Sequence, residues 1–275
     1  MRPRGVMERY LAAAVQMSSG ADRASNLDRA AALVREAAGR GARLVVLPEV
    51  FAWRGPRGGE REHAEPVPGP TTSALGALAR NLGIYLCAGS LLEAVPGEPH
   101  PFNTSCVLDP SGALVARYRK LHLFDVDIPG VSVQESATRA PGAEVVTVPT
   151  ELGTLGLSIC YDLRFPELYR RLTRAGAEVL LVPSAFTFPT GAAHWETLCR
   201  ARAIENQCYL IAPDQTGTSP QGVADYGESS IVDPWGWVLA RASAGEGFVT
   251  AEIDLAYLAR VRREMPCLAH ARLTA

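Results

Sequence analysis

The sequence from Leu155 to Glu167, LGLSICYDLRFPE, places a thiol where a short apolar run gives way to polar, aromatic and charged residues. The run predicts a buried strand, and Pro166 followed by apolar residues at helical spacing predicts a helix with proline in its first turn. Cys160 therefore occupies a strand–turn–helix corner, where a helix N-terminus favours a thiolate. This is the chemistry of a nucleophile, although a buried structural cysteine fits the same stretch taken alone.

Three charged residues occupy comparable positions elsewhere in the chain. Glu49 follows Pro48 at the end of a buried strand, Lys120 ends another predicted strand, and Glu135 lies in an irregular stretch. Taken singly, each fits a solvated surface charge. Charged side chains are rarely placed at the ends of buried strands without a partner, however. We therefore expect the three to converge with Cys160 on one cleft.

The elements that position these residues follow from apolar periodicity and from turn and capping signals. Ser25 or Asn26 is the expected cap of the first helix. Residues 54–70 form a long loop near a site, with 54–65 as a possible lid, and 121–142 are irregular. The predicted strands are 10–17, 43–47, 84–90, 104–108, 114–119, 144–148, 155–159, 178–182, 208–212, 229–232, 237–240 and 248–253, and the predicted helices are 26–39, 71–82, 166–174, 194–206 and 255–264.

Two segments of the chain repeat the same order of elements. Residues 31–49 run helix, glycine and the apolar strand LVVLPE, and residues 169–184 run helix, glycine and VLLVPS. Alternating helices and strands predict an α/β fold in which helices cover one face of each sheet. We expect a four-layer α-β-β-α sandwich of two halves related by a pseudo-twofold. Residues 10–275 are predicted to form a single domain after an N-terminal extension, residues 1–9.

The composition bounds the classes of function. The formal net charge of −2 does not indicate the excess of basic residues that nucleic-acid binding requires. No apolar run approaches the roughly 18–20 residues of a membrane span. The six cysteines include no CxxC pair, which indicates reduced thiols in a cytoplasm and neither a disulfide framework nor a zinc site. Basic residues before Leu11 loosely imitate a signal peptide, but Gln16 interrupts the apolar run and favours a first strand.

Several stretches occur along the chain in the order typical of one known family. They are Leu47–Glu49, Tyr118–Asp125, Ile128–Gly130, Gln134–Ser136, Gly156–Glu167, Pro183–Phe186, Ala193–Glu196, Arg200–Gln207 and Val232–Gly236. On these stretches the chain resembles the nitrilase superfamily, the carbon–nitrogen hydrolases with a Glu-Lys-Cys site. The resemblance spans residues 10 to about 272 and is closest to the branch that holds omega-amidase and deaminated glutathione amidase. The stretches Arg164–Glu167 and Arg202–Gln207 favour the second of these.

The resemblance implies a role for each charged residue. Cys160 attacks an amide carbonyl, Glu49 serves as general base and acid, and Lys120 stabilises the oxyanion together with the N–H of Tyr161. Glu135 holds Lys120. Arg164 is the candidate partner of a substrate carboxylate, with an ion pair to Asp162 as its structural alternative. The expected substrate-binding residues are Tyr161, Arg164, Phe186 and Thr187.

The implied function is hydrolysis of the terminal carboxamide of a small, 2-oxo acid to acid and ammonia through a cysteine thioester, without a cofactor or metal. Deaminated glutathione-type substrates are favoured; omega-amidase, nitrilase and N-carbamoyl amide hydrolase activities, and acyl transfer to an amine, are alternatives. The implied assembly is a homodimer or higher homo-oligomer. Glu228 departs from the His or Asn of relatives and would disfavour acidic substrates if it faced the pocket.

Three other classes of protein would require different features of the sequence. A Cys-His hydrolase would use His122 or His194 as its base, and nothing in the sequence places an Asn or Asp beside either. His194 and Trp195 fit a core or a dimer face better. A zinc hydrolase would need clustered ligands, whereas the five histidines are scattered. A non-catalytic binding protein would make Cys160 dispensable.

Overall fold

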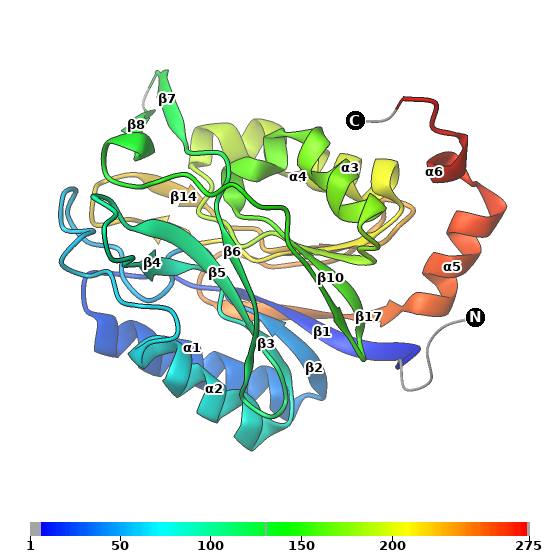
Figure 1. Ribbon diagram of the computed structural model, residues 1–275, viewed down its shortest axis with the longest axis horizontal. Helices are drawn as coiled ribbons and strands as arrows, with labels where there is room; N and C mark the ends of the chain where they lie inside the picture. The colour runs from blue at the N-terminus through cyan, green and yellow to red at the C-terminus, as the bar shows by residue number, and fades with distance from the viewer. Residues whose placement is uncertain (1–6, 130, 274–275) are drawn as a thin grey trace.

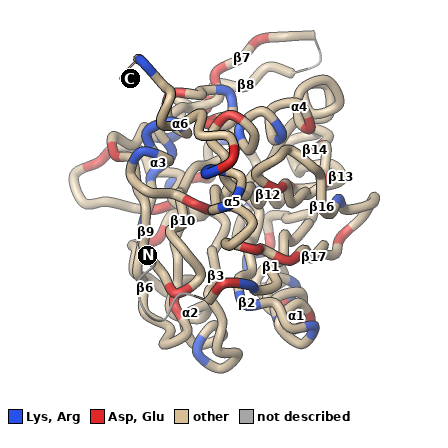
Figure 2. Tube along the Cα trace, turned by 90° about the vertical axis from the view of Figure 1, so that its right-hand side faces the viewer, with Lys and Arg blue, Asp and Glu red and all other residues tan. Residues whose placement is uncertain are grey.

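The computed structural model describes residues 7–129 and 131–273. Its two main sheets pack face to face, with helices α1 and α2 outside one sheet and α3 and α4 outside the other (Figure 1). This is the α-β-β-α order that the sequence predicts. Figure 2 shows basic and acidic residues interspersed along the chain. No helix in the described ranges is long and apolar enough to cross a membrane.

The first sheet has the strand order β17-β1-β2-β3-β5-β4, and β6 pairs with β5 beside this path. Its central strands β1, β2 and β3 run parallel, and β17 and β5 flank them antiparallel. The strands are β1 (Arg9–Gln16), β2 (Ala42–Val46), β3 (Tyr85–Cys87), β4 (Leu91–Glu93), β5 (Phe102–Leu108), β6 (Leu114–Arg119) and β17 (Gly247–Asp254), and the covering helices are α1 (Arg23–Gly39) and α2 (Pro70–Leu82).

The second sheet repeats this plan with the order β16-β15-β12-β11-β10-β9. Strands β10, β11 and β12 run parallel, and β9 and β15 flank them antiparallel. The repetition is the structural basis of the predicted pseudo-twofold. The strands are β9 (Thr147–Thr150), β10 (Gly153–Leu157), β11 (Val179–Leu181), β12 (Tyr209–Ala212), β15 (Ser230–Val232) and β16 (Val238–Arg241), and the covering helices are α3 (Pro166–Arg174) and α4 (Phe188–Asn206).

Side chains of β1 point alternately to its two faces, so this one strand contributes to two separate apolar cores. Ala12 and Ala14 lie in the apolar core that both sheets share, whereas Ala13 and Val15 pack in the core under α1 and α2. Successive residues of a strand point to opposite faces, so an uninterrupted apolar strand indicates burial on both sides. That residues 10–275 form one domain stays a prediction, which this shared core supports.

Several boundaries differ from the predicted ones. The carboxylate of Asp22 caps α1 by accepting from the N–H groups of Ala24 and Ser25, so the expected cap at Ser25 or Asn26 is wrong. Helix α4 begins at Phe188, six residues earlier than predicted, and α5 (Leu255–Glu264) begins after Asp254 as predicted. Residues 1–6 of the expected N-terminal extension lie outside the described residues.

The stretch 121–142 is not irregular throughout, because strands β7 (Asp125–Ile128) and β8 (Val131–Gln134) form a hairpin within it. A second small hairpin, of β13 (Thr216–Thr218) and β14 (Ala224–Tyr226), was also not predicted. Short helices complete the described fold: the 3-10 helices Glu135–Ala137 and Cys160–Arg164, and α6 (Cys267–His270). All six cysteines are free, and Cys267 alone among them is exposed.

Candidate active site

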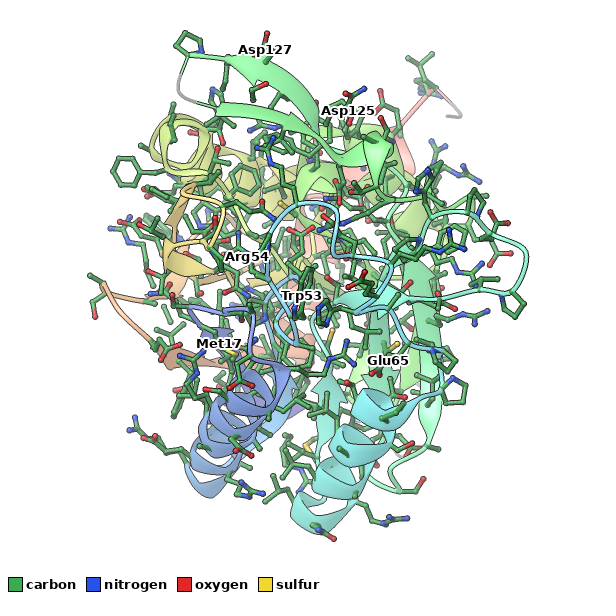
Figure 3. All side chains as sticks on the ribbon, turned by 90° about the vertical axis from the view of Figure 1, so that its left-hand side faces the viewer. Met17, Trp53, Arg54, Glu65, Asp125 and Asp127 are labelled. Carbon is green, nitrogen blue, oxygen red and sulfur yellow. The ribbon has the colours of Figure 1, made fainter. Side chains whose placement is uncertain are left out.

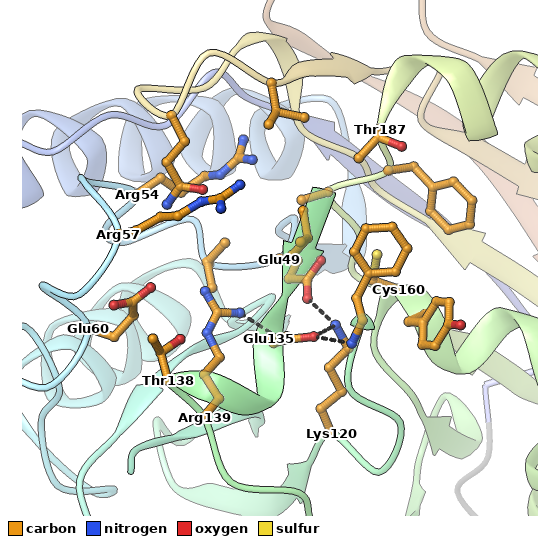
Figure 4. A pocket seen from close by; sticks show the side chains of 18 of the residues that line it. Glu49, Arg54, Arg57, Glu60, Lys120, Glu135, Thr138, Arg139, Cys160 and Thr187 are labelled. Atoms are coloured by element: carbon orange, nitrogen blue, oxygen red, sulfur yellow. Dashed lines mark hydrogen bonds and ion pairs between the residues drawn. The ribbon is translucent and has the colours of Figure 1, made fainter. Parts of the chain in front are cut away.

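The ends of four elements bring the predicted site residues together. Glu49 follows β2, Lys120 follows β6, Glu135 opens a 3-10 helix after β8, and Cys160 opens another after β10. All four line one cavity of about 320 Å³. Figure 4 shows their side chains turned toward one another. The convergence on one cleft that the sequence predicts is therefore present in the structure.

Lys120 is held between two carboxylates. Its Nζ lies 2.9 Å from Oε1 of Glu49 and 2.9 Å from Oε2 of Glu135, and the side chain is only 2% exposed. Burial alone would lower the pKa of Lys120, but Glu135 and Glu49 outweigh it and raise the pKa above its ordinary value. Lys120 is therefore a permanently charged group facing the cavity.

Glu135 anchors this lysine from the far side. One of its oxygens, Oε2, also accepts from the N–H of Phe124 at 2.7 Å, and Oε1 accepts from Arg139 Nη1 at 2.6 Å. Burial would raise the pKa of Glu135, but Lys120 and then Arg139 lower it to about 2. Glu135 thus stays ionised and fixes the position of the Lys120 ammonium.

Asn103 is a site residue that the sequence reasoning missed. Its Nδ2 donates to Glu49 Oε1 at 2.7 Å and to Glu135 Oε1 at 3.3 Å, and the side chain is fully buried. The pairing of β5 with β6 places it there, because the backbone N–H of Lys120 donates to the carbonyl of Asn103 at 2.8 Å. The predicted hairpin of these two strands indicates that they pair but not in which register, so it does not identify Asn103.

Cys160 lies at a strained turn, with a φ of +46° that residues with a side chain seldom adopt. The expectation of a thiolate at a helix N-terminus is wrong. Burial raises the pKa of the Cys160 thiol well above its ordinary value, Glu49 raises it further, and Lys120 opposes them. A 3-10 helix follows the thiol and α3 begins only at Pro166, so Cys160 needs a base to become a nucleophile.

Asp162 connects the cysteine turn to the end of β6. Its buried carboxylate accepts from the Tyr118 hydroxyl at 2.6 Å and from the N–H groups of Ile159 at 2.8 Å and His122 at 3.1 Å. It also lies 2.7 Å from His122 Nδ1. An aspartate is thus present beside His122, contrary to expectation. His122 is not among the described residues that line the cavity, however, so this pair holds the turn instead of facing a substrate.

The predicted substrate-binding residues Tyr161, Arg164, Phe186 and Thr187 all line the cavity. The Arg164 guanidinium lies over the rings of Tyr161 and Phe186, at 5.8 and 5.2 Å from their centroids. Its Nη1 lies 3.1 Å from His194 Nδ1. The alternative ion pair with Asp162 is wrong, because no carboxylate in the described part of the chain pairs with Arg164. The guanidinium is free to bind an anion.

The long loop after β2 forms another wall of the cavity, which Trp53, Arg54, Arg57 and Glu60 line. Arg54 forms an ion pair with Asp225 of β14, and the Asp225 side chain is 1% exposed. Figure 3 shows Trp53 and Arg54 between the hairpin that carries Asp125 and Asp127 and the helices α1 and α2. This ion pair joins the loop to the second half of the chain across the site.

Comparison with known proteins agrees with this geometry. The model of the carbon-nitrogen hydrolase family matches residues 11–263. The chain belongs to this family. Among relatives, the deaminated glutathione amidase of Synechocystis is 45% identical over 268 residues (96% of this chain and 98% of the relative), and omega-amidase NIT2 of Danio rerio is 42% identical over 261 residues (94% of each). The crystal structure of Saccharomyces cerevisiae Nit3, a member of branch 10 of the nitrilase superfamily, superposes with a TM-score of 0.86 at 34% identity and covers 97% of both chains.

In this carbon-nitrogen hydrolase, the unusual Glu228 does not reach the cavity. Its carboxylate lies 3.2 Å from Arg241 Nη1, and its carbonyl accepts from Trp195 Nε1 at 3.0 Å. Glu228 is not among the described residues that line the cavity. It therefore adds no negative charge to the site, and the expected bias against acidic substrates does not follow.

Proposed function

We propose that this enzyme hydrolyses amides of small 2-oxo acids through a thioester on Cys160. One observation carries the proposal: Cys160, Glu49, Lys120 and Glu135 line a single cavity in which the lysine is held between the two carboxylates. The family membership supports carbon–nitrogen bond hydrolysis, and the arrangement supplies a nucleophile, a base and a fixed cation for it.

Acylation begins when Sγ of Cys160 attacks the amide carbonyl carbon while Glu49 takes the thiol proton. A neutral thiol requires this coupling, since burial and Glu49 itself disfavour the free thiolate. The Nζ of Lys120 and the N–H of Tyr161 stabilise the oxyanion that forms. The carbon–nitrogen bond then breaks, Glu49 returns the proton to the leaving nitrogen, and a thioester remains on Cys160.

Deacylation uses the same groups in the same places. Glu49 takes a proton from water, whose oxygen attacks the thioester carbonyl, and the second oxyanion is stabilised by Lys120. The carbon–sulfur bond breaks, the thiol regains its proton, and the carboxylic acid leaves. Asn103 and Glu135 keep their positions throughout, because their hydrogen bonds fix Glu49 and Lys120 relative to each other.

Two observations support the substrate class: an arginine lines the cavity, and relatives of this chain are amidases that act on deaminated glutathione or as omega-amidases. Arg164 is positioned to pair with the carboxylate of a 2-oxo acid, and Tyr161, Phe186 and Thr187 form the adjoining wall. Terminal carboxamides such as 2-oxoglutaramate, the omega-amidase alternative, release ammonia. In deaminated glutathione the amide nitrogen belongs to cysteinylglycine, so its hydrolysis releases that dipeptide. We favour deaminated glutathione.

The test is a substrate screen of the wild type and of Cys160→Ala. Deaminated glutathione, 2-oxoglutaramate, 2-oxosuccinamate and simple nitriles are incubated with each protein, and ammonia, cysteinylglycine and 2-oxo acid are all measured. We expect turnover of 2-oxo acid amides by the wild type alone, with an acyl adduct on Cys160 in the mass spectrum. Equal turnover by both proteins would refute the covalent mechanism, and turnover of nitriles alone would refute the amidase assignment.

We also propose that the enzyme is a homodimer in the cytoplasm. Trp235, Trp237 and Leu239 expose 49%, 64% and 44% of their surfaces, and Gly236 between the two tryptophans lies against the exposed Ile204 of α4. A second copy of the chain would cover these apolar side chains. The unpaired cysteines support a reducing compartment. Light scattering of the wild type and of Trp237→Asp tests the assembly, with a dimer expected for the first and a monomer for the second.

A further inference from the structure

The charges that line the cavity do not all pair with one another. Five basic and four acidic side chains are among its described lining residues. Glu49 and Glu135 hold Lys120, and Asp225 holds Arg54. Two guanidiniums besides Arg164 are left incompletely satisfied: those of Arg57 and Arg139.

Arg139 is a mostly buried arginine that does not use all of its N–H donors in hydrogen bonds. Its side chain is 16% exposed, and its Nη1 donates to Glu135. Its Nε is buried without any hydrogen-bond partner in the described structure. Its Nη2 is not enclosed in this way and has no hydrogen bond in the described structure, so it is the donor that a ligand oxygen can reach. Because Arg139 and Lys120 bind opposite oxygens of Glu135, this guanidinium lies one carboxylate group away from the proposed oxyanion site.

Arg57 approaches the same side of the cavity from the loop after β2. Its Nη2 donates to the carbonyl of Ser132 in β8 at 2.7 Å, which fixes the guanidinium at the rim without neutralising it. Among the described residues no carboxylate pairs with it. Figure 4 shows Arg57 and Arg139 on the side of the cavity away from Cys160.

One carboxylate, that of Glu60, lies on this wall and must be counted against the two arginines. Glu60 accepts from the N–H of Gly58 at 2.8 Å and forms no hydrogen bond with Arg57 or Arg139 in the described structure. Arg139 is itself paired with Glu135, which also holds Lys120, so Arg57 is the guanidinium of this wall that no carboxylate of the described residues pairs with. The wall therefore offers one unpaired guanidinium, together with the remaining N–H donors of Arg139, in a confined space where a carboxylate can accept from both.

From these contacts we infer that Arg57 and Arg139 form a second carboxylate subsite, across the reacting centre from Arg164. The inference rests on the proposed function and narrows its substrate class. The preferred substrate is an amide flanked by carboxylates on both sides, one on the 2-oxo acyl part and one on the departing amine. Deaminated glutathione has this form, with the glycine carboxylate on its amine part, whereas 2-oxoglutaramate loses only ammonia.

The test compares deaminated glutathione with the same molecule whose glycine carboxylate is capped as a carboxamide. Both are titrated calorimetrically into Cys160→Ala protein, which cannot turn them over. We expect capping to raise Kd about tenfold with Arg57 present, and less than about twofold after Arg57→Gln, because the arginine then no longer distinguishes the two ligands. Arg139 is left intact, since its removal would also release Glu135.

Arg61→Gln is the matched control, because Arg61 is an exposed arginine of the same loop that does not line the cavity. It should keep the tenfold effect of capping. A capping effect of equal size with and without Arg57 would overturn the subsite while leaving the proposed function intact. Binding of neither ligand, together with no turnover of any 2-oxo acid amide by the wild type, would overturn both.

Discussion

Replacing Lys120 with methionine removes the charge that the whole site is arranged around. The side chain has similar length, so the cavity keeps its shape while Glu49 and Glu135 lose their shared cation. Both carboxylates are buried and only 2.9 Å from the ammonium in the wild type. The substitution therefore leaves two like charges in a place that water scarcely reaches.

The expected cost can be worked from Glu135. Its pKa lies at about 2 in the folded protein, against an ordinary value of 4.5. Each pKa unit corresponds to about 1.4 kcal/mol, so the ionised form of this carboxylate stabilises the fold by about 3 kcal/mol. Breaking a buried ion pair by removing one partner costs about 3–5 kcal/mol, which agrees. Lys120 lowers this pKa more than Arg139 or the N–H of Phe124 does, so Lys120→Met should lower the free energy of unfolding at pH 7 by most of that amount and abolish turnover.

The pH dependence of stability gives a sharper test, because the pKa of Glu135 is lowered in the folded wild type and raised in folded Lys120→Met. A lowered pKa stabilises the folded wild type above pH 4.5, and that stabilisation is lost as the pH falls toward 2. In the variant the pKa of Glu135 rises, so Glu135 is protonated more easily in the folded protein. Acidification therefore does not remove the stabilisation that it removes from the wild type. Urea unfolding followed by circular dichroism should show that the wild type and the variant differ less in free energy of unfolding at pH 3.5 than at pH 7. A difference below about 1 kcal/mol at pH 7, or one that does not change with pH, would refute the reasoning.

Three further predictions concern the surroundings of this centre. Glu49→Gln should move the pH midpoint of iodoacetamide alkylation at Cys160, read by peptide mapping, to lower pH, since a neighbouring negative charge is removed; an unchanged or higher midpoint would contradict the assigned cause. Gly89→Ala should destabilise the fold by more than about 2 kcal/mol and reduce kcat. Gly89 has a φ of +53°, and the new Cβ would lie 2.0 Å from the carbonyl oxygen of Pro48, the residue before Glu49. Gly20→Ala, whose Cβ would meet no atom within 4 Å, should change neither the stability nor kcat appreciably. Arg54→Gln should lower the free energy of unfolding by about 3 kcal/mol at pH 8 and by less at pH 5, because its buried partner carboxylate can then fold protonated; a loss that is the same at both pH values would argue against an ionised pair.

Much of the fold could be predicted because its signals are local. The strand at 114–119 and the helix at 166–174 match the structure residue for residue, since apolar periodicity and Pro166 mark them. The hairpin of β7 and β8 was missed because its strands are short and mostly exposed, with Val131 as their one buried residue, so they show no apolar alternation. The start of α4 was missed because the exposed Phe188 and its neighbours show no helical stripe.

The site was predictable in its residue types but not in its contacts. Glu49, Lys120 and Cys160 each lie at the end of a strand that the sequence predicts. Asn103 could not be identified without the register of β5 against β6, and Asp162 could not be assigned to His122 without the packing of two distant segments. The direction of the thiol pKa shift was mispredicted because burial and Glu49 raise this pKa and outweigh Lys120, which lowers it.

Lys120 is also the only lysine in the 275-residue chain. Apart from the α-amine, the folded enzyme therefore presents no side chain to amine-directed reagents, since this one is 2% exposed. The number of amine labels gained by the protein becomes a direct count of molecules whose catalytic cavity has opened. A lysine-specific protease would likewise have a single cleavage point in the unfolded chain, which would divide it between the proposed oxyanion group and the nucleophile.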